Sequence, residues 1–137
     1  MKKVYPVLIA FISVFIFSCG KVAEITEKPP TTLEPKTEKK GLYTYVVPAN
    51  FIFEEEKSLI YEKGKDVRAY VVYTGKARLK DLVEFFDEYL YKLGWEKESK
   101  LVGEEAILAY SRNEQLIVIK IEPKFATTHI KMLLTKD

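Results

Sequence analysis

Cys19 carries the most distinctive chemistry in this sequence, because it is the only cysteine among the 137 residues. A single thiol can neither close a disulfide within the chain nor build a thiolate metal cluster. Its thiolate is nonetheless a strong nucleophile, and the residue directly before it, Ser18, is small. The chemistry open to Cys19 is therefore that of a lone nucleophile.

The segment before Cys19 has the order of a secretory signal peptide. Lys2 and Lys3 supply the positive start, and residues 4–17 are almost wholly apolar, with Pro6 near their beginning. A permanent membrane span needs about 20 apolar residues, so this shorter stretch makes a span the second choice. We predict that residues 1–18 are a signal peptide.

The end of this segment, Ile16-Phe17-Ser18-Cys19, resembles a bacterial lipobox, with an aliphatic residue three positions before the cysteine and a small one directly before it. The resemblance implies a thioether-linked diacylglycerol on Cys19, cleavage between Ser18 and Cys19, and acyl chains such as palmitate on the protein. Phe17 departs from the pattern, which prefers a smaller residue there. The alternative is a chance cysteine after an ordinary signal peptide or an anchor helix.

Residues 19–41 are predicted to form a lipidated, disordered tether. Residues 20–41 contain three prolines and four threonines and leave their large apolar residues isolated, so no period supports a helix or strand. Gly20 is not the aspartate associated with inner-membrane retention in some bacteria. We therefore expect a location in the cell envelope, lipid-anchored to a membrane, with the outer membrane favoured where the cell has one.

Residues 42–137 are predicted to form a single α+β domain. They contain 12 Lys and 3 Arg against 12 Glu and 4 Asp, a net charge of −1, so they lack the basic footprint of a nucleic-acid-binding protein. A helix is predicted over 78–93, because its apolar residues recur on one face and Gly94 can cap its end. These apolar residues are Leu79, Leu82, Val83, Phe86, Tyr89, Leu90 and Leu93.

Strands are predicted on both sides of this helix from β-branched and aromatic runs separated by turn residues. Two precede it, at 58–61 and 67–73, and four follow it, at 95–102, 106–111, 115–122 and 128–135. Short links favour antiparallel neighbours. We expect a curved antiparallel sheet of about six strands, in the order strand–strand–helix–four strands, packed on one long helix. Ile117, Ile119 and Ile121 are expected to form the row beneath that helix.

A search for catalytic, cofactor-binding and metal-binding groups yields none that we assign. His129 is the only histidine, and Glu54-Glu55-Glu56 lacks the alternating spacing of a calcium loop. Tyrosines are numerous for a small domain, and exposed tyrosine is common at protein and carbohydrate interfaces. Five tyrosines are expected to lie outside the core stripe, and ordinary half-exposed positions on an antiparallel sheet are favoured over a binding role for them: Tyr43, Tyr45, Tyr70, Tyr91 and Tyr110.

Several short motifs resemble a family of small bacterial lipoproteins of unknown function. They are Pro48-Ala-Asn-Phe51, the Tyr-x-Gly-x-Ala pattern at 73–77, the amphipathic helix with Phe85-Phe86, and Gly94-Trp95. The resemblance covers most of residues 50–137 and implies the α+β fold and an envelope location, without an activity. Each motif also has a structural interpretation: Gly75 would turn the strand into the helix, and the Trp95 indole would bind a backbone carbonyl.

The functional expectation is a non-enzymatic, membrane-anchored envelope protein that binds another protein or an envelope polymer. An alternative is a small-molecule or lipid carrier that uses a groove between helix and sheet. A hydrolase would require two carboxylates that converge in a cleft. The oligomeric state stays open.

Overall fold

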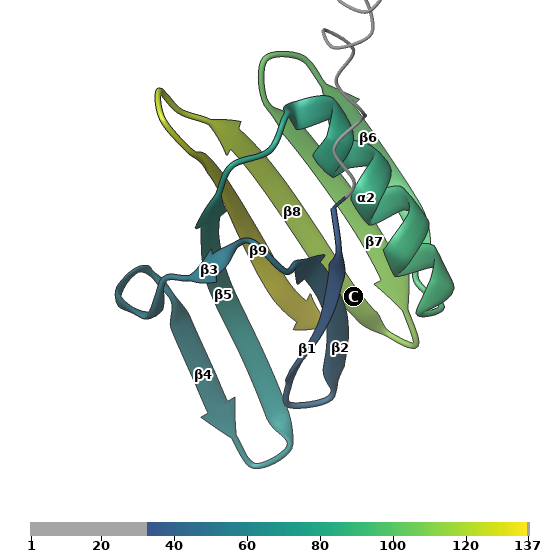
Figure 1. The fold of residues 1–137 in the computed structure, drawn as a ribbon. Coiled ribbons are helices and arrows are strands. Elements are labelled where there is room, and N and C mark those ends of the chain that lie inside the picture. The colour runs from purple at the N-terminus through teal and green to yellow at the C-terminus, as the bar shows by residue number, and fades with distance from the viewer. Residues whose placement is uncertain (1–32, 137) are drawn as a thin grey trace, which may run out of the picture. The chain divides into compact units, whose positions relative to one another are not determined.

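The computed structural model describes residues 33–136, which form a mainly antiparallel α+β fold with one α-helix (Figure 1). The elements in chain order are β1 (Pro35–Lys40), β2 (Tyr43–Pro48), β3 (Ile52–Phe53), the 3₁₀ helix η2 (Glu55–Lys57), β4 (Leu59–Lys63), β5 (Asp66–Gly75), α2 (Leu79–Lys92), β6 (Glu96–Val102), β7 (Ala106–Arg112), β8 (Gln115–Pro123) and β9 (Thr128–Lys136). The predicted α+β class with an antiparallel sheet is confirmed.

Seven of the strands form one sheet in the order β3-β5-β9-β8-β7-β6, and β4 pairs with β5 on the same side as β3. Strands β6 to β9 are consecutive antiparallel neighbours, as the short links between them predict. Strand β5, which precedes the helix, pairs with β9 at the end of the chain. The pairing of β5 with β9 places the hairpin of β4 and β5 beside strands β6 to β9.

Two-residue turns set the register of the hairpins. In the β4–β5 turn Gly64 has a φ of +62° and holds the first central position, where a type II′ turn places glycine. In the β7–β8 turn both Asn113 and Glu114 have positive φ, as a type I′ turn requires. Each turn therefore fixes which residue pairs of its hairpin are hydrogen-bonded and which are not.

Helix α2 begins and ends within a residue of its predicted bounds. Gly94, with a φ of +92°, adopts the left-handed conformation after the last turn, and the Trp95 N–H donates to the Leu90 carbonyl at 3.0 Å. The buried side chains of the helix belong to the same core cluster as those of the sheet. They are Leu82, Val83, Phe85, Phe86 and Leu90.

The core lies between the seven-stranded sheet and a layer made of α2 and the β1–β2 hairpin. Helix α2 contacts β2, β6, β7 and β8. Ile117, Ile119 and Ile121 of β8 are fully buried in this cluster, as predicted. Tyr45 and Val47 of β2 also lie in it, so the hairpin extends the cover that the helix provides.

The predicted tether boundary at Gly41 is wrong, because part of the predicted tether belongs to the folded domain. Residues 35–40 form β1, which pairs along its whole length with β2, and Leu33 is buried in the core. The sequence of β1 is polar and has no alternating apolar residues. Its backbone hydrogen bonds to β2 hold it as a strand instead. The predicted strand count was too low, because β1, β2 and β3 were not anticipated.

The predicted signal peptide at 1–18 and the tether up to Thr32 lie outside the described residues. Between Leu33 and Lys136, no helix has the length and apolar character that crossing a membrane requires.

Candidate binding surface

The two residues with a predicted covalent role, Ser18 and Cys19, lie outside the described part of the chain. The remaining sequence motifs all fall within it. Two of them, Pro48-Ala-Asn-Phe51 and the Tyr-x-Gly-x-Ala pattern, meet at the junction between β5 and α2.

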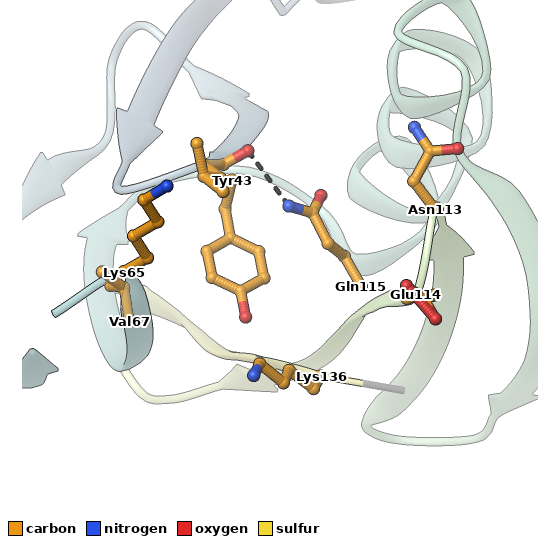
Figure 2. Close-up of a pocket in the computed structure, with 8 residues that line it drawn as sticks. Tyr43, Lys65, Val67, Asn113, Glu114, Gln115 and Lys136 are labelled. Carbon is orange, nitrogen blue, oxygen red and sulfur yellow. Dashed lines mark hydrogen bonds between the residues drawn. The ribbon is translucent and has the colours of Figure 1, made fainter. Parts of the chain in front are cut away.

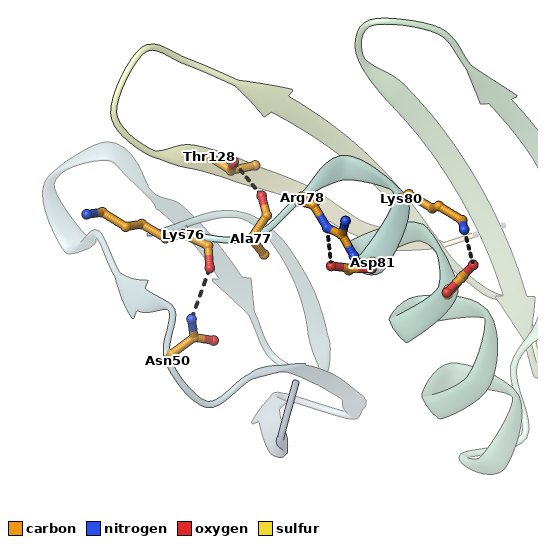
Figure 3. A network of polar contacts seen from close by, with 8 residues as sticks. Asn50, Lys76, Ala77, Arg78, Lys80, Asp81 and Thr128 are labelled. Carbon is orange, nitrogen blue, oxygen red and sulfur yellow. Dashed lines mark hydrogen bonds and ion pairs between the residues drawn. The ribbon is translucent and has the colours of Figure 1, made fainter. Parts of the chain in front are cut away.

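Side chains from distant segments hold this junction (Figure 3). Asn50 Nδ2 donates to the Lys76 carbonyl at 3.2 Å, and Thr128 Oγ1 donates to the Ala77 carbonyl at 3.0 Å. Arg78, the N-cap residue, forms a two-pronged ion pair with Asp81 in the first turn of α2, at 2.9 and 3.1 Å. A carboxylate in the first turn also interacts favourably with the helix dipole. The junction is thus a structural anchor for the helix.

Gly75 of the Tyr-x-Gly-x-Ala pattern is required for packing, which corrects the expectation that it turns the strand. It is the last residue of β5, and a Cβ at this position would lie 2.7 Å from the ring of Phe51. Phe51 is buried in the core. The two motifs that contain these residues are therefore parts of one contact.

Trp95 closes the other end of the helix as expected. Its indole Nε1 donates to the Thr44 carbonyl at 2.9 Å, and its side chain is buried. The guanidinium of Arg112 lies over the ring, with 4.7 Å between its Cζ and the ring centroid. This contact ties the helix end to β2 and β7.

Most of the tyrosines expected outside the core lie inside it. Tyr43, Tyr45 and Tyr110 are buried, Tyr70 is half-buried, and Tyr91 alone of the five is exposed, at 76%. The hydroxyl of Tyr110 donates to Asp87 Oδ1 at 2.6 Å, which shows why a tyrosine suits this core position. A surplus of tyrosine therefore carries no argument for an interface here.

Tyr45 and Tyr73 form a buried hydroxyl pair, with 2.9 Å between their oxygens. The Tyr73 hydroxyl donates to Glu38 Oε1 at 3.3 Å, which leaves Tyr45 as the donor to Tyr73. Burial raises the pKa of Tyr45 to about 12, and burial and the bond to Tyr45 raise the pKa of Tyr73 further. Both phenols stay protonated at neutral pH, so they act as structural donors that join β1, β2 and β5.

The face of the sheet that points away from α2 carries several exposed apolar side chains. Because side chains alternate along a strand, the residues between the core positions point to this side. We call it the open face, and define it by the side chains of Leu59, Tyr70, Val72, Leu101, Ile107, Ala109, Val118, Lys120, Glu122, Lys131 and Leu133.

An apolar row crosses the open face from strand to strand. Leu59 pairs with Tyr70, Tyr70 with Leu133, and Leu133 with Val118. Leu59 is 72% exposed and Leu133 is 43% exposed, while Tyr70 and Val118 are half-buried. Ile107 and Leu101 add exposed apolar area on β7 and β6. A contiguous exposed apolar patch is a candidate interaction site.

Lysines surround one buried carboxylate at the edge of this row. Glu122 has 7% of its side chain exposed and lies 2.9 Å from Lys120 Nζ and 2.9 Å from Lys131 Nζ, with Lys124 Nζ at 3.7 Å. Bonds from Lys131 and Lys120 lower the pKa of Glu122 to about 2. Lys120 also approaches Glu105 at 3.8 Å. Three ammonium groups thus face two carboxylates, and the cluster is net positive.

The apolar row and the lysine cluster meet in a shallow hollow of about 230 Å³. Tyr70, Val118 and Leu133 form its apolar wall, and Lys120, Glu122 and Lys131 form its polar side. The combination suits a partner that presents both an apolar group and a negative charge. Because Glu122 is held ionised well below neutral pH, it is a poor general acid.

A second hollow, of about 330 Å³, lies at the other end of the sheet where three hairpin turns meet (Figure 2). Gln115 Nε2 donates to the Leu42 carbonyl at 3.1 Å across it, and Lys136 approaches Asp66 at 3.8 Å. The eight lining residues include neither histidine nor cysteine. They are Leu42, Tyr43, Lys65, Val67, Asn113, Glu114, Gln115 and Lys136.

The remaining candidate groups stay apart from one another. Glu54, Glu55 and Glu56 lie in and beside η2 and line an open depression with Phe53. His129 is half-buried on β9, opposite Glu122 in the β8–β9 register. Within residues 33–136, no three side chains of His, Cys, Asp or Glu come together as metal ligands would.

No family model matches the chain, and no curated protein or solved structure matches it. Sequence reasoning missed the open face, although its signal is present: β8 alternates Ile117, Ile119 and Ile121 with Val118, Lys120 and Glu122. Among the described residues, the open face combines exposed apolar area with unbalanced charge and is the candidate binding surface.

Proposed function

We propose that this protein is a non-enzymatic, lipid-anchored envelope protein whose folded domain binds another protein or an envelope polymer through the open face. The observation that carries the proposal is the apolar row from Leu59 to Val118, which meets the lysine cluster around Glu122. Interfaces join an apolar centre to a polar rim in this way. Nucleic acid is an unsuitable partner, because residues 42–137 have a net charge of −1.

The anchor in this proposal is a lipid on Cys19, added as the signal peptide is removed between Ser18 and Cys19. The lipobox-like residues 16–19 and the motifs shared with small bacterial lipoproteins of unknown function support it. Several buried acyl chains would hold the protein firmly, since each CH₂ contributes about 0.8 kcal/mol. Gly20 favours the outer membrane over the inner one where both exist. The domain that the structure describes starts at Leu33, 14 residues after the lipid-bearing residue.

The anchor is tested directly by Cys19→Ser. This variant should lose metabolic labelling with a fatty acid and accumulate as the uncleaved precursor, because the peptidase requires the lipidated cysteine. Normal cleavage of Cys19→Ser would contradict the anchor without affecting the proposal for the open face.

The binding surface is tested by photo-crosslinking in intact envelopes. A photoreactive amino acid replaces Leu133 or Ile107 on the open face, and Tyr91, on the outer side of α2, serves as the exposed control. We expect discrete adducts at the first two positions and none at Tyr91. Sensitivity of the adduct to protease or to glycan-degrading enzymes then separates a protein partner from a polymer. No adduct at Leu133 and Ile107, or the same adduct from all three positions, would contradict the proposal.

A small-molecule or lipid carrier is the second candidate, and the contact between helix and sheet gives it less support. Leu82, Phe86 and Leu90 of α2 are completely buried in the core cluster, as are Ile117, Ile119 and Ile121 of β8 beneath them. A carrier would need an apolar cavity of several hundred Å³ here. We also propose that the sheet curves around α2, which keeps this layer filled. Binding of a fluorescent fatty acid with one-to-one stoichiometry would favour the carrier.

A further inference from the structure

The two outer edges of the seven-stranded sheet differ in how they are protected. An edge strand exposes unpaired N–H and C=O groups, and proteins normally blunt such edges with charges or bulges. Strand β6 has both devices: four of its seven residues are charged, and its register shifts between Lys97 and Ser99. The lysines Lys97 and Lys100 also pair with Asp87 of α2, at 3.2 and 3.3 Å.

Strand β4, at the opposite edge, has neither a bulge nor a charge in its first three positions. Leu59, Ile60 and Tyr61 are 72%, 47% and 53% exposed, and their pairing with β5 is regular. Among the described residues β4 pairs with β5 alone. An exposed apolar edge of this kind is a template for another strand.

The hairpin register shows which backbone groups β4 presents. Lys63 and Asp66 flank the two-residue turn, so they form a hydrogen-bonded pair, and Tyr61–Arg68 and Leu59–Tyr70 follow as such pairs. Val72 supports this alternation, because its backbone groups point to the same side of β5 as those of Tyr70. Its N–H donates to Ser58 Oγ at 3.0 Å, and its carbonyl accepts from Glu54 N–H. The N–H and C=O groups of Ile60 and Glu62 therefore point away from β5, toward the outside of the sheet.

We propose that β4 pairs antiparallel with β4 of a second copy of this chain, with Ile60 opposite its counterpart on the two-fold axis. In that register Leu59 faces the second copy's Tyr61, so all six exposed apolar side chains meet apolar partners. Shifting the axis to Tyr61 would instead place Ile60 opposite Glu62 and Leu59 opposite Lys63. The self-complementary side chains select a second copy as the occupant, and a two-fold pairing of identical strands closes without leaving a further edge.

The pairing would also join the two open faces. Leu59 and Tyr61 lie on the same side of the sheet as Tyr70, because Leu59 is opposite Tyr70 and Tyr61 is two residues further along. The apolar row of one copy would then continue into that of the other. The dimer goes beyond the proposed binding function and stands or falls independently of it.

Disulfide crosslinking tests the register in the full-length, membrane-anchored protein. In Ile60→Cys the two Cα atoms would be about 5.5 Å apart, within the range that a disulfide spans. In Glu62→Cys they would be roughly 13 Å apart, which a disulfide cannot span. The wild-type chain, with Cys19 as its only cysteine, controls for background. A covalent dimer in Ile60→Cys alone is expected; its absence, or equal dimer formation in Glu62→Cys, would overturn the proposal.

Sedimentation of the full-length protein in detergent measures dimer formation through the β4 edge without crosslinking. Ile60→Pro removes an N–H that points away from β5, so the β4–β5 ladder is kept while the dimer bond is lost. We expect its dimer dissociation constant to rise about tenfold or more. Val102→Lys makes a charged change at an exposed position of the β6 edge and should leave the constant unchanged. A wild-type monomer at about 100 µM, or an undiminished dimer in Ile60→Pro, would refute the pairing.

Discussion

The two faces of the seven-stranded sheet are built from alternate residues of the same strands, and they differ in what covers them. On β8, Ile117, Ile119 and Ile121 are fully buried beneath α2, whereas Val118 and Lys120 are half-buried on the open face. The fully buried residues on the covered face of this strand are all apolar, and the open face mixes apolar residues with charge. A single strand thus serves a core with one set of side chains and a candidate binding surface with the other.

The difference separates residues that determine stability from residues that are free to serve binding. Covered-face side chains lose all contact with water, and removing them leaves a cavity that the fold cannot fill. Most open-face side chains keep part of their exposure, so their removal costs little in the isolated domain; Val72 and Glu122 are the buried exceptions. Substitutions on the two faces should therefore change different measurements, and the following predictions test that separation.

The largest effect is expected on the covered face. Phe86→Ala removes a fully buried ring that packs edge-on against Phe85 at 5.2 Å between centroids. We expect a loss of about 3–5 kcal/mol in the free energy of unfolding, measured by urea denaturation. Tyr91→Ala, five residues on and 76% exposed, should change it by less than about 0.5 kcal/mol. Equal losses for the two variants would contradict the layered core.

The next effect is expected at Gly75, where the last residue of β5 packs against the ring of Phe51. Gly75→Ala introduces a Cβ 2.7 Å from the Phe51 ring, which forces a buried aromatic to move. Overpacking of this kind costs about 1–3 kcal/mol. Gly103→Ala is the matched control, because no heavy atom outside its chain neighbours lies within 4 Å of the added Cβ. A thermal unfolding series in which Gly103→Ala lowers stability as much as Gly75→Ala would refute this explanation.

A pH-dependent effect is expected on the open face from Glu122. Its pKa is lowered to about 2 in the folded protein by bonds from Lys131 and Lys120, against about 4.3 in an unfolded chain. The folded state therefore binds fewer protons between these values. The stabilisation is complete above about pH 4.3 and is lost as the pH falls toward 2.

Glu122→Gln removes this contribution, and we expect it to lower stability at pH 7 by about 1–2 kcal/mol. Its stability should also fall less steeply than that of the wild type between pH 4.5 and 2.5. Glu84→Gln, at an exposed ion pair with Lys80, is the control and should keep the wild-type slope. Parallel stability curves for Glu122→Gln and the wild type would show that the lysines do not hold this carboxylate in solution.

Residues 58–136 follow sequence periodicity closely, and residues 33–53 do not. The helix and strands β5, β7, β8 and β9 were predictable because each buries one face, so its apolar residues recur with the period of the element. Strands β4 and β6 are exposed along their whole length, and the turn residues that bound them were the available signal. Strand β1 (Pro35–Lys40) has no such period, because it forms on backbone pairing to β2. Strand β2 contains Tyr45, Val46 and Val47, whose β-propensity was the available signal.

The open face was harder to predict than the core for a related reason. Alternation along β8 shows that its two sides differ, but the strand order decides which exposed residues become neighbours. Leu59, Tyr70 and Leu133 come from three strands that are far apart in sequence, and they form a row because β5 lies between β4 and β9. The cluster around Glu122 likewise needs β9 beside β8 to bring Lys131 within 2.9 Å.

The smallest effect on stability is expected from the residue most central to the apolar row. Leu133→Ser removes a side chain that is 43% exposed and borders the hollow with Tyr70 and Val118. We expect the free energy of unfolding to change by less than about 0.5 kcal/mol, because the covered face is untouched. The same variant should weaken adduct formation from a photoreactive residue at Ile107, because the partner loses an apolar contact. A loss of more than about 1.5 kcal/mol in urea denaturation would instead make Leu133 part of the core and remove the distinction between the two faces.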